Sequence, residues 1–389
     1  MAVRSRLSLI VTLAIALPAL FSQGCGEGQN DLTNRDAGFF GINGNLVFNL
    51  VIADQMALVD RHLEGIANLG VTFVRSQADW RRVEQEHPVG RAGRDFTITD
   101  AWVERLSAHG LRWQVVGNGR PTPRWAADEA DYLACGSRAA PADADHFPRY
   151  MAALARRYGH EGSFWREHPD LPELPPIAYE VWNEPNHGAF WCPQPDPEAY
   201  ATLLAKTANA IRRVDPSATI LFGGLAAFES AAPSDGPLGR LSYREFLIRA
   251  LQSAPARAVD GVAVHPYGAT PAVVGAQLEG FRSAINAAGL ASVPLYVNEA
   301  GWYTNGIGGR PPTPEATRSE YIGEFAATVW SARERLNIAS FAPYSWTTRE
   351  QDPADPQDWF GLADPASARP YPSALAYGAA VRDRDNRLP

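Results

Sequence analysis

Two glutamates at the ends of short apolar runs carry most of the chemical information in this sequence. Glu184 follows the run of residues 177–183, and Glu299 follows the run of residues 293–298. Such runs, flanked by Asn, Trp, Gly or Pro, are typical of buried strands in a parallel sheet. Carboxylates that follow these strands lie where a barrel of strands opens to solvent, and two of them can break an acetal: one protonates the leaving oxygen and the other faces the anomeric carbon. The pair therefore predicts chemistry on glycosidic bonds.

The elements that would position these glutamates form a repeated pattern from about Gly38 onward, in which short β-type runs alternate with longer amphipathic segments. We expect strands at 39–43, 71–75, 112–117, 177–183, 219–223, 261–267, 294–299 and 340–346. The clearest expected helices are 54–68, 100–109, 200–214, 270–288 and 317–336. Eight such pairs predict an α/β fold, a single-domain (β/α)8 TIM barrel, and no phosphate-binding Gly fingerprint follows the first strand to favour an open doubly wound sheet. Strands four and seven lie across the barrel mouth from each other, so Glu184 and Glu299 should meet there.

The first residues have the pattern of an export signal. Arg4 and Arg6 precede an apolar run at 7–21, and small residues lie just before Cys25. Because Gly24-Cys25 resembles the end of a bacterial lipoprotein signal, a lipid anchor at Cys25 stays an open alternative to simple secretion. No later run reaches the length of a transmembrane helix. We therefore expect a secreted or cell-envelope bacterial protein, organised as a signal peptide at 1–24, a linker at 25–37, a barrel at 38–381 and a tail at 382–389.

Composition narrows the class of partner. The 389-residue chain is 46% hydrophobic and 20% charged, and it contains 11 Trp, which suffices for a large core and an aromatic binding cleft. A net charge of -8 without a basic stripe argues against nucleic acid and anionic membranes. We expect a monomer that binds carbohydrate.

The cysteines predict one disulfide. Cys25 stands alone near the start, whereas Cys135 and Cys192 lie in long segments that follow the third and fourth expected strands. An exported protein matures in an oxidising compartment, so we expect these two to form a bridge at one rim of the barrel. Two unpaired buried thiols are the alternative.

Specific motifs surround both glutamates. Trp182-Asn183-Glu184-Pro185-Asn186 resembles the acid/base strand of the retaining glycoside hydrolases of clan A, and Asn298-Glu299-Ala300-Gly301-Trp302 is similar to that clan's nucleophile strand. Asn186 after the acid/base and Phe190-Trp191 beyond it make family 39, with related bacterial exopolysaccharide glycosidases, the most similar group; family 5 shares the Asn-Glu-Pro core. One departure is Asn298, where relatives often carry Thr or another small residue.

The resemblance implies a double displacement that retains the anomeric configuration. Glu184 would be the acid/base, with a pKa raised by the nearby charge of Glu299, and Glu299 would be the nucleophile. Asn183 would bind the sugar 2-hydroxyl. Arg75 and Tyr267 would keep Glu299 ionised and oriented.

Other residues are expected to complete the substrate site. Trp346 would form the floor under the sugar ring, because a pyranose packs well on an indole. His265 would contact substrate, with a structural imidazole as the alternative. Glu180 points lower into the barrel and should be a core carboxylate paired with an Arg. Further sugar-stacking candidates are Trp191, Trp302, Trp80 and Trp125.

Other chemistries find less support. The histidines lack the two-His spacing of zinc hydrolases, and neither a Gly-rich phosphate loop nor a Gly-x-Ser-x-Gly elbow occurs, so we expect no cofactor and no metal. A Ca²⁺ ion held by loop aspartates stays open. Two further alternatives are a carbohydrate-binding protein without catalysis and a transglycosylase that uses the same residues.

Overall fold

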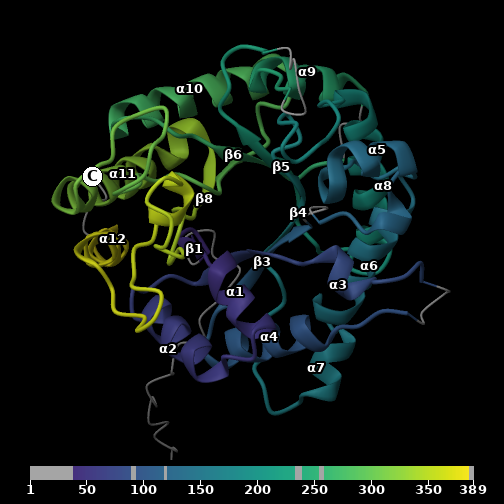
Figure 1. The fold of residues 1–389 in the computed structure, drawn as a ribbon, viewed down its shortest axis with the longest axis horizontal. Helices are drawn as coiled ribbons and strands as arrows, with labels where there is room; N and C mark the ends of the chain where they lie inside the picture. The colour runs from purple at the N-terminus through teal and green to yellow at the C-terminus, as the bar shows by residue number, and fades with distance from the viewer. Residues whose placement is uncertain (1–37, 89–92, 118–120, 233–238, 254–257, 385–389) are drawn as a thin grey trace, which may run out of the picture.

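The computed structural model of the chain describes residues 38–88, 93–117, 121–232, 239–253 and 258–384. Eight parallel strands form one sheet in the order in which they occur along the chain, each paired with the next (Figure 1). The strands are β1 Gly41–Asn43, β2 Phe73–Gln77, β3 Arg112–Gly117, β4 Ala178–Asn183, β5 Ile220–Ala226, β6 Gly261–His265, β7 Leu295–Val297 and β8 Ile338–Phe341. The last strand returns to the first through a parallel bridge between Phe40 and Phe341. The predicted TIM barrel is therefore confirmed.

Helices surround the barrel as an outer ring (Figure 1). They are α1 Asn45–Ile52, α2 Met56–Ala67, α3 Trp80–Val83, α4 Thr97–Ala108, α5 Glu129–Cys135, α6 His146–Tyr158, α7 Ser163–Glu167, α8 Pro197–Arg212, α9 Tyr243–Ser253, α10 Pro271–Ala287, α11 Glu315–Leu336 and α12 Pro372–Arg382. Local signals set several of their starts. The Asp196 carboxylate accepts hydrogen bonds from the first turn of α8, and Pro197 occupies a position where its missing N–H costs nothing.

The strands are buried on both faces, as parallel strands covered by helices must be. All six residues of β4 and all seven of β5 are buried. Apolar side chains fill the layer between strands and helices, whereas the barrel axis near the carboxyl ends of the strands contains buried polar groups, including Arg75 and Glu180. The fold therefore gathers its polar chemistry at one end of the barrel.

Two expected strands differ from the observed ones in a way that matters for the site. The strand expected at 340–346 is β8, which ends at Phe341, so the chain has left the sheet five residues before Trp346. The strand expected at 294–299 is β7, which ends at Val297. Glu299 still follows its strand closely, but Trp346 does not end a strand.

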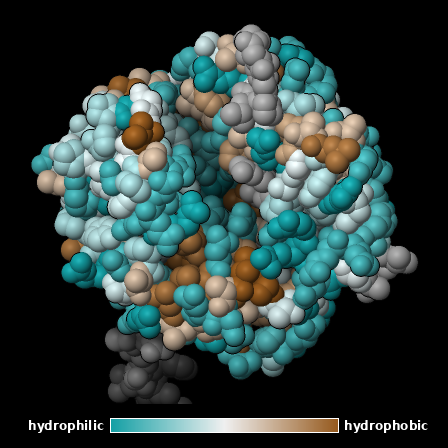
Figure 2. Space-filling model, viewed as in Figure 1, coloured by the Kyte–Doolittle hydropathy of each residue, from teal (hydrophilic) through white to brown (hydrophobic). Residues whose placement is uncertain are grey.

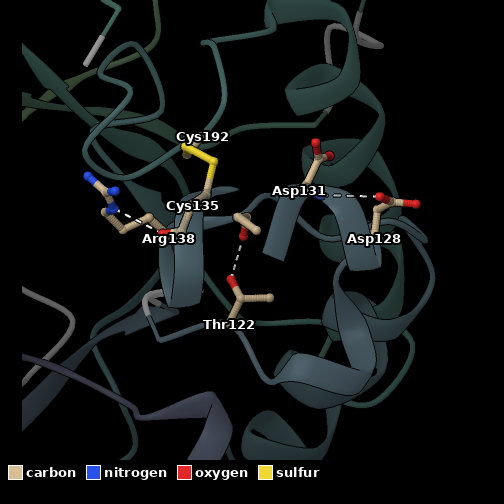
Figure 3. The surroundings of a disulfide bond; sticks show 7 residues. Thr122, Asp128, Asp131, Cys135, Arg138 and Cys192 are labelled. Atoms are coloured by element: carbon tan, nitrogen blue, oxygen red, sulfur yellow. Dashed lines mark hydrogen bonds between the residues drawn. A yellow bond between two sulfur atoms is a disulfide. The ribbon is translucent and has the colours of Figure 1, made fainter. Parts of the chain in front are cut away.

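The predicted disulfide between Cys135 and Cys192 is confirmed (Figure 3). It links the end of α5, in the segment after β3, to the segment after β4. Backbone hydrogen bonds support the link on both sides, since Cys192 N donates to Arg138 O and Ala140 N donates to Cys192 O. The bridge therefore joins the two long loops at the mouth of the barrel.

The export signal, the linker and Cys25 lie outside the described residues. Among the residues that are described, no helix has both the length and the apolar character of a membrane span.

Removing the disulfide should destabilise the protein. The bridge closes a sequence separation of 57 residues, and the loss of chain entropy in the unfolded state predicts a stabilisation of about 4 kcal/mol. A Cys135→Ser/Cys192→Ser variant should therefore unfold at a lower urea concentration than the oxidised protein. Reductant should lower the midpoint of the wild type and leave that of the variant unchanged. Equal midpoints for the oxidised wild type and the variant would contradict the prediction.

Candidate active site

A cavity of about 970 Å³ opens at the carboxyl ends of the strands. The space-filling view shows a hollow near the centre of the ring of helices (Figure 2). The residues expected to do chemistry or to bind substrate line this cavity in part: Arg75, Asn183, Glu184, Tyr267 and Glu299. Its volume lies at the upper end of the range for small-molecule sites, so it has room for more than one sugar ring.

The two glutamates face the same space. One carboxylate oxygen of Glu184, one of Glu299 and a ring nitrogen of His265 all lie within 4.8 Å of one another. Only 15% of the Glu184 side chain and 11% of the Glu299 side chain are exposed. A separation of about 5 Å is that of a nucleophile and an acid/base, whereas an acid and a base that activate water lie about 6.5 to 9.5 Å apart.

The backbone that presents Glu184 is unusual. Trp182 has a φ of 74° and Glu184 a φ of 44°, both in the left-handed region that non-glycine residues seldom adopt. The Glu184 N–H donates to Gly224 O at 2.9 Å, and the Trp182 indole N–H donates to Phe190 O. Strained backbone of this kind persists where neighbours hold it in place, and it concentrates at functional sites.

Arg75, at 1% exposure, holds one of the two glutamates and joins it to the barrel core. Its Nη1 donates to Glu299 Oε1 at 2.7 Å and to Asn43 Oδ1 at 2.8 Å. Its Nε and Nη2 donate to the two oxygens of Glu180 at 2.8 Å each, and Nη2 also donates to Asn183 Oδ1 at 3.0 Å. One guanidinium therefore fixes groups from several strands.

Glu180 is the buried counter-charge of Arg75, as expected from its position lower in the barrel. Its carboxylate also accepts from Asn298 Nδ2 at 2.7 Å and from Gly224 N at 2.9 Å. Burial opposes ionisation of Glu180, but the Arg75 guanidinium outweighs this effect and keeps the pKa of the Glu180 carboxyl below its usual value. These contacts also explain Asn298, because a smaller residue could not reach Glu180.

Glu299 is held at both of its oxygens. Arg75 binds Oε1, and the Tyr267 hydroxyl donates to Oε2 at 2.9 Å. Burial raises the pKa of Tyr267 well above its ordinary value, and the charge of Glu299 adds to this effect. Tyr267 therefore keeps its proton and donates it to Glu299, which holds the carboxyl group in one orientation.

His265 contacts Glu184 from the buried side of the site. Arg75 Nη2 lies 3.3 Å from His265 Nε2, which must then be unprotonated, so Nδ1 carries the proton and donates to Glu184 Oε1 at 3.0 Å. The residue is fully buried and does not line the cavity. Gly224 makes this packing possible, since a Cβ there would lie 2.0 Å from Nε2. The expectation that His265 contacts substrate is wrong. The alternative, a hydrogen-bonded imidazole with a structural role, describes it better.

His187 is a second imidazole beside Glu184 that the sequence analysis did not single out. Its Nδ1 lies 3.6 Å from Glu184 Oε2, and the residue lines the cavity. Burial raises the pKa of Glu184, but the interactions with His187 and His265 outweigh burial and lower the pKa below its usual value. The expected increase in the pKa of Glu184 is therefore wrong for the substrate-free protein.

The tryptophans expected to stack on sugars lie elsewhere. Trp346 is fully buried and donates from Nε1 to His62 Nδ1 on α2, because the chain turns away from the sheet after β8. Trp302 packs against α11, and Trp191 packs between other aromatic side chains of the core. These three assignments are wrong. The weaker candidates also lie outside the cavity, with Trp80 buried and Trp125 against His146.

Other aromatic side chains line the cavity instead: Phe190, Phe228, Tyr303, Tyr344 and Phe360. Tyr344, which follows β8, has its ring centroid 5.4 Å from that of Phe360. The sequence alone does not indicate that Tyr344 rather than Trp346 faces the cavity. Both residues follow β8, and which of them faces the cavity depends on where the chain leaves the sheet. The aromatic lining of the cavity is therefore made by these side chains and not by the tryptophans.

The trio of Glu184, His265 and Glu299 is also the one metal-capable group found among the described residues. Arg75 donates to Glu299 and also to His265, so a cation there would lie beside a buried guanidinium. That charge disfavours a metal ion at this position.

Solved structures with a similar fold include glycoside hydrolases. No protein-family model matches the sequence, and no curated protein matches it either. A family 39 glycoside hydrolase from Bacteroides cellulosilyticus matches over 89% of this chain with a TM-score of 0.59 and 18% identity; this chain spans 64% of that protein. A monomeric beta-xylosidase from Caulobacter crescentus has a TM-score of 0.59 and 20% identity over 88% of this chain and 67% of its own. A family 5 mannosidase from Rhizomucor miehei has a TM-score of 0.56 and 13% identity over 90% of this chain and 94% of its own. The chain is similar in fold to family 39 and family 5 enzymes.

Replacing Glu180 should destabilise the protein strongly. Glu180→Gln removes the bidentate partner of a buried guanidinium, and breaking such a pair costs about 3 kcal/mol or more. The control is Glu198→Gln, which breaks an exposed pair with Arg249 and should leave the urea midpoint close to that of the wild type.

The difference between wild type and Glu180→Gln should also depend on pH. The folded-state pKa of Glu180 lies below the unfolded value of about 4.3, so the stabilisation is complete above that value and disappears as the pH falls through the folded pKa. Unfolding curves at pH 7 and in the acid range measure the difference. A difference that stays constant, or grows, as the pH falls would contradict this role.

Replacing His187 should raise the pKa of Glu184. His187→Phe removes one of the two imidazoles that favour the ionised carboxyl and preserves the ring contacts with Phe190 and Phe228. Titration of carboxyl-labelled glutamate by ¹³C NMR, assigned with Glu184→Gln, measures the change. His160→Phe is the control, because His160 lies near Glu173 instead. An unchanged or lower pKa of Glu184 in His187→Phe would show that His187 does not act on it.

Proposed function

We propose that the protein is a retaining glycoside hydrolase that cleaves β-glycosidic bonds in an extracellular or envelope polysaccharide or oligosaccharide. The observation that carries this proposal is the placement of two carboxyl oxygens within 4.8 Å at the mouth of the barrel. The fold neighbours are family 39 and family 5 glycoside hydrolases, and the motifs around Glu184 and Glu299 resemble those of the same clan.

The first step forms a covalent intermediate. Glu299 attacks the anomeric carbon, the bond from that carbon to the leaving oxygen breaks, and Glu184 gives its proton to that oxygen. Arg75 and Tyr267 orient the nucleophile through its two oxygens before the attack. Asn183, which lines the cavity beside Glu184, is positioned to hydrogen-bond the sugar at the bond that reacts.

The second step releases the sugar. Glu184, now ionised, takes a proton from water, whose oxygen attacks the anomeric carbon and breaks the ester bond to Glu299. Esterification has removed the negative charge of Glu299, which lowers the proton affinity of Glu184 at the stage where the reaction needs a base. Two inversions at one carbon give net retention.

The proton on Glu184 limits the pH range of the first step. His187 and His265 lower its pKa, so the protonated form is lost as the pH rises through that lowered value. The activity should therefore be highest at acidic pH, with Glu184 defining the alkaline limb of the profile.

The lining of the cavity suits a carbohydrate. Aromatic rings of Tyr344, Phe190 and Phe228 offer flat apolar surfaces, while Asn45, Gln77 and Gln357 offer polar groups at the same cavity. This mixture matches sugars, which present apolar faces and hydroxyl edges.

We also propose that the protein is exported and acts outside the cytoplasm, with or without a lipid anchor at Cys25. The basic and apolar start of the sequence supports export. The disulfide at the cavity rim is consistent with an oxidising compartment.

Each catalytic glutamate can be tested with a panel of aryl β-glycosides. Glu299→Gln should reduce kcat/KM by about 10⁴-fold or more, because the variant lacks the carboxylate oxygen that forms the bond to the anomeric carbon. Glu184→Gln should lose about 10²- to 10⁴-fold on substrates with poor leaving groups and much less on dinitrophenyl glycosides, which need no proton. The control Glu279→Gln, on the outer surface of α10, should behave as wild type.

The covalent step has its own test. A 2-deoxy-2-fluoro glycosyl fluoride should label Glu299 stoichiometrically, as seen by peptide mass spectrometry, and NMR of the first product should show the retained anomer. Azide should restore turnover to Glu299→Gly with an inverted glycosyl azide. An unlabelled protein that turns over substrate with inversion would refute the retaining mechanism, and full activity in Glu299→Gln would refute the assignment altogether.

A further inference from the structure

Arg310 brings a positive charge to the cavity that the proposed mechanism does not use. It lies in the segment between β7 and α11, and it lines the cavity together with its neighbours Gly308 and Gly309. The residue is partly exposed, so its head group is accessible from the cavity.

The charges around Arg310 differ from those around Arg75. Arg75 is within 2.8 Å of both Glu180 and Glu299, which neutralise it. No carboxylate of the described residues lies within 4.0 Å of Arg310 to form an ion pair. Its guanidinium carbon instead lies 5.9 Å from the ring centre of Tyr267 and 5.4 Å from that of Tyr303. Arg310 therefore combines a full charge with an aromatic surrounding and with space on the cavity side.

Its hydrogen-bonding capacity is only partly used. Nη1 donates to Gly268 O at 2.6 Å and Nη2 donates to Gly301 O at 3.4 Å. A guanidinium has five N–H donors in a planar fork, and with the Tyr303 hydroxyl as one further side-chain partner, part of this capacity is still unused. The two backbone contacts fix the position of the fork, and the remaining donors are free to bind a ligand.

The position of Arg310 relates it to the reacting bond. Tyr267 contacts both groups, since its hydroxyl donates to Glu299 Oε2 at 2.9 Å and the Arg310 guanidinium carbon lies 5.9 Å from the centre of its ring. A sugar whose anomeric carbon is at Glu299, or the sugar next to it, can therefore extend a substituent toward Arg310. A guanidinium fork can bind a planar carboxylate through two parallel hydrogen bonds.

We propose that Arg310 binds the carboxylate of a uronic acid unit, so that the cavity accepts an acidic saccharide. The inference deepens the proposed function, on which it depends only for a sugar as the occupant. The carboxylate would receive two charge-assisted hydrogen bonds and would neutralise the one cavity arginine that has no acidic partner among the described residues. Neutral hexoses would lack this interaction.

The backbone contacts also give Arg310 a structural role in holding the segment after β7, and the test must separate the two roles. A purely structural arginine would affect acidic and neutral sugars alike when replaced. A carboxylate-binding arginine would affect the acidic sugar alone. The difference between matched sugars is therefore the quantity to measure.

The experiment is a ligand-observed NMR titration of the full chain with three matched pairs: glucuronate and glucose, galacturonate and galactose, mannuronate and mannose. At least one uronate should bind wild type about tenfold or more tightly than its matching hexose, which is the usual strength of a hydrogen bond to a charged group. Arg310→Gln should lose this margin, with hexose binding unchanged within about threefold. Arg310→Lys should keep part of it, and the surface control Arg335→Gln should keep all of it.

Each possible result of the titration either supports or overturns the binding of a uronate by Arg310. Uronates that bind wild type no better than hexoses, or a margin that survives Arg310→Gln, would overturn the inference. Tighter binding of glucose 6-sulfate than of glucuronate would overturn the assignment to a carboxylate. Because binding needs no turnover, the result is independent of the Glu299→Gln assay. A loss of margin in Arg310→Gln alongside full turnover in Glu299→Gln would refute the proposed mechanism and leave the acidic-sugar site standing.

Discussion

The buried guanidinium of Arg75 is the interaction on which the rest of the site depends. It reaches Asn43 on β1, Glu180 and Asn183 on β4, His265 on β6, and Glu299 just beyond β7. Removing two charges from water is expensive, so the pair with Glu180 is weak evidence for stability as such. Its value is geometric, because one rigid fork sets the relative positions of side chains that come from distant parts of the chain. The eight-stranded barrel supplies the strand ends, and Arg75 joins them into one site.

The two glutamates receive opposite kinds of support from this arrangement. Glu299 is held by the Arg75 guanidinium and the Tyr267 hydroxyl, which fix the positions of its two oxygens. Glu184 instead contacts two imidazoles: His265 Nδ1 lies 3.0 Å from one carboxyl oxygen, and His187 Nδ1 lies 3.6 Å from the other. A nucleophile must stay ionised throughout, whereas an acid/base must gain and lose a proton in each cycle. The supporting groups match this division of labour, and His265 connects the two halves because it accepts from Arg75 and donates to Glu184.

Sequence reasoning predicted the barrel, the placement of both glutamates at its mouth, a core Glu180 paired with an unspecified arginine, and the disulfide, since each follows from periodicity, strand order or compartment. It placed the aromatic lining wrongly. A tryptophan near a strand end looks like a sugar platform, yet Trp346 turns outward to His62 because β8 ends at Phe341. Trp302 and Trp191 likewise pack in the core. Periodicity shows that a strand exists but not where the chain leaves the sheet, and that point decides which side chain faces the cavity. The pKa of Glu184 was missed for a related reason, because His187 approaches it through a turn whose shape the sequence does not specify.

The structure also separates chemistry from selectivity. The groups that would act on the bond come from strand ends and are tied to Arg75, so they tolerate little change. The groups that would choose the sugar come from segments beyond the strands: Phe190 after β4, Arg310 after β7, and Tyr344 and Phe360 after β8. These segments are held by separate contacts with other loops, such as the disulfide between Cys135 and Cys192 and the hydrogen bond from Arg310 to Gly268 O. A change of substrate could therefore arise in one loop without disturbing the carboxylates. This separation is how a shared barrel accommodates different sugars, and it is why the identity of the saccharide has to be sought in the loops rather than in the catalytic motifs.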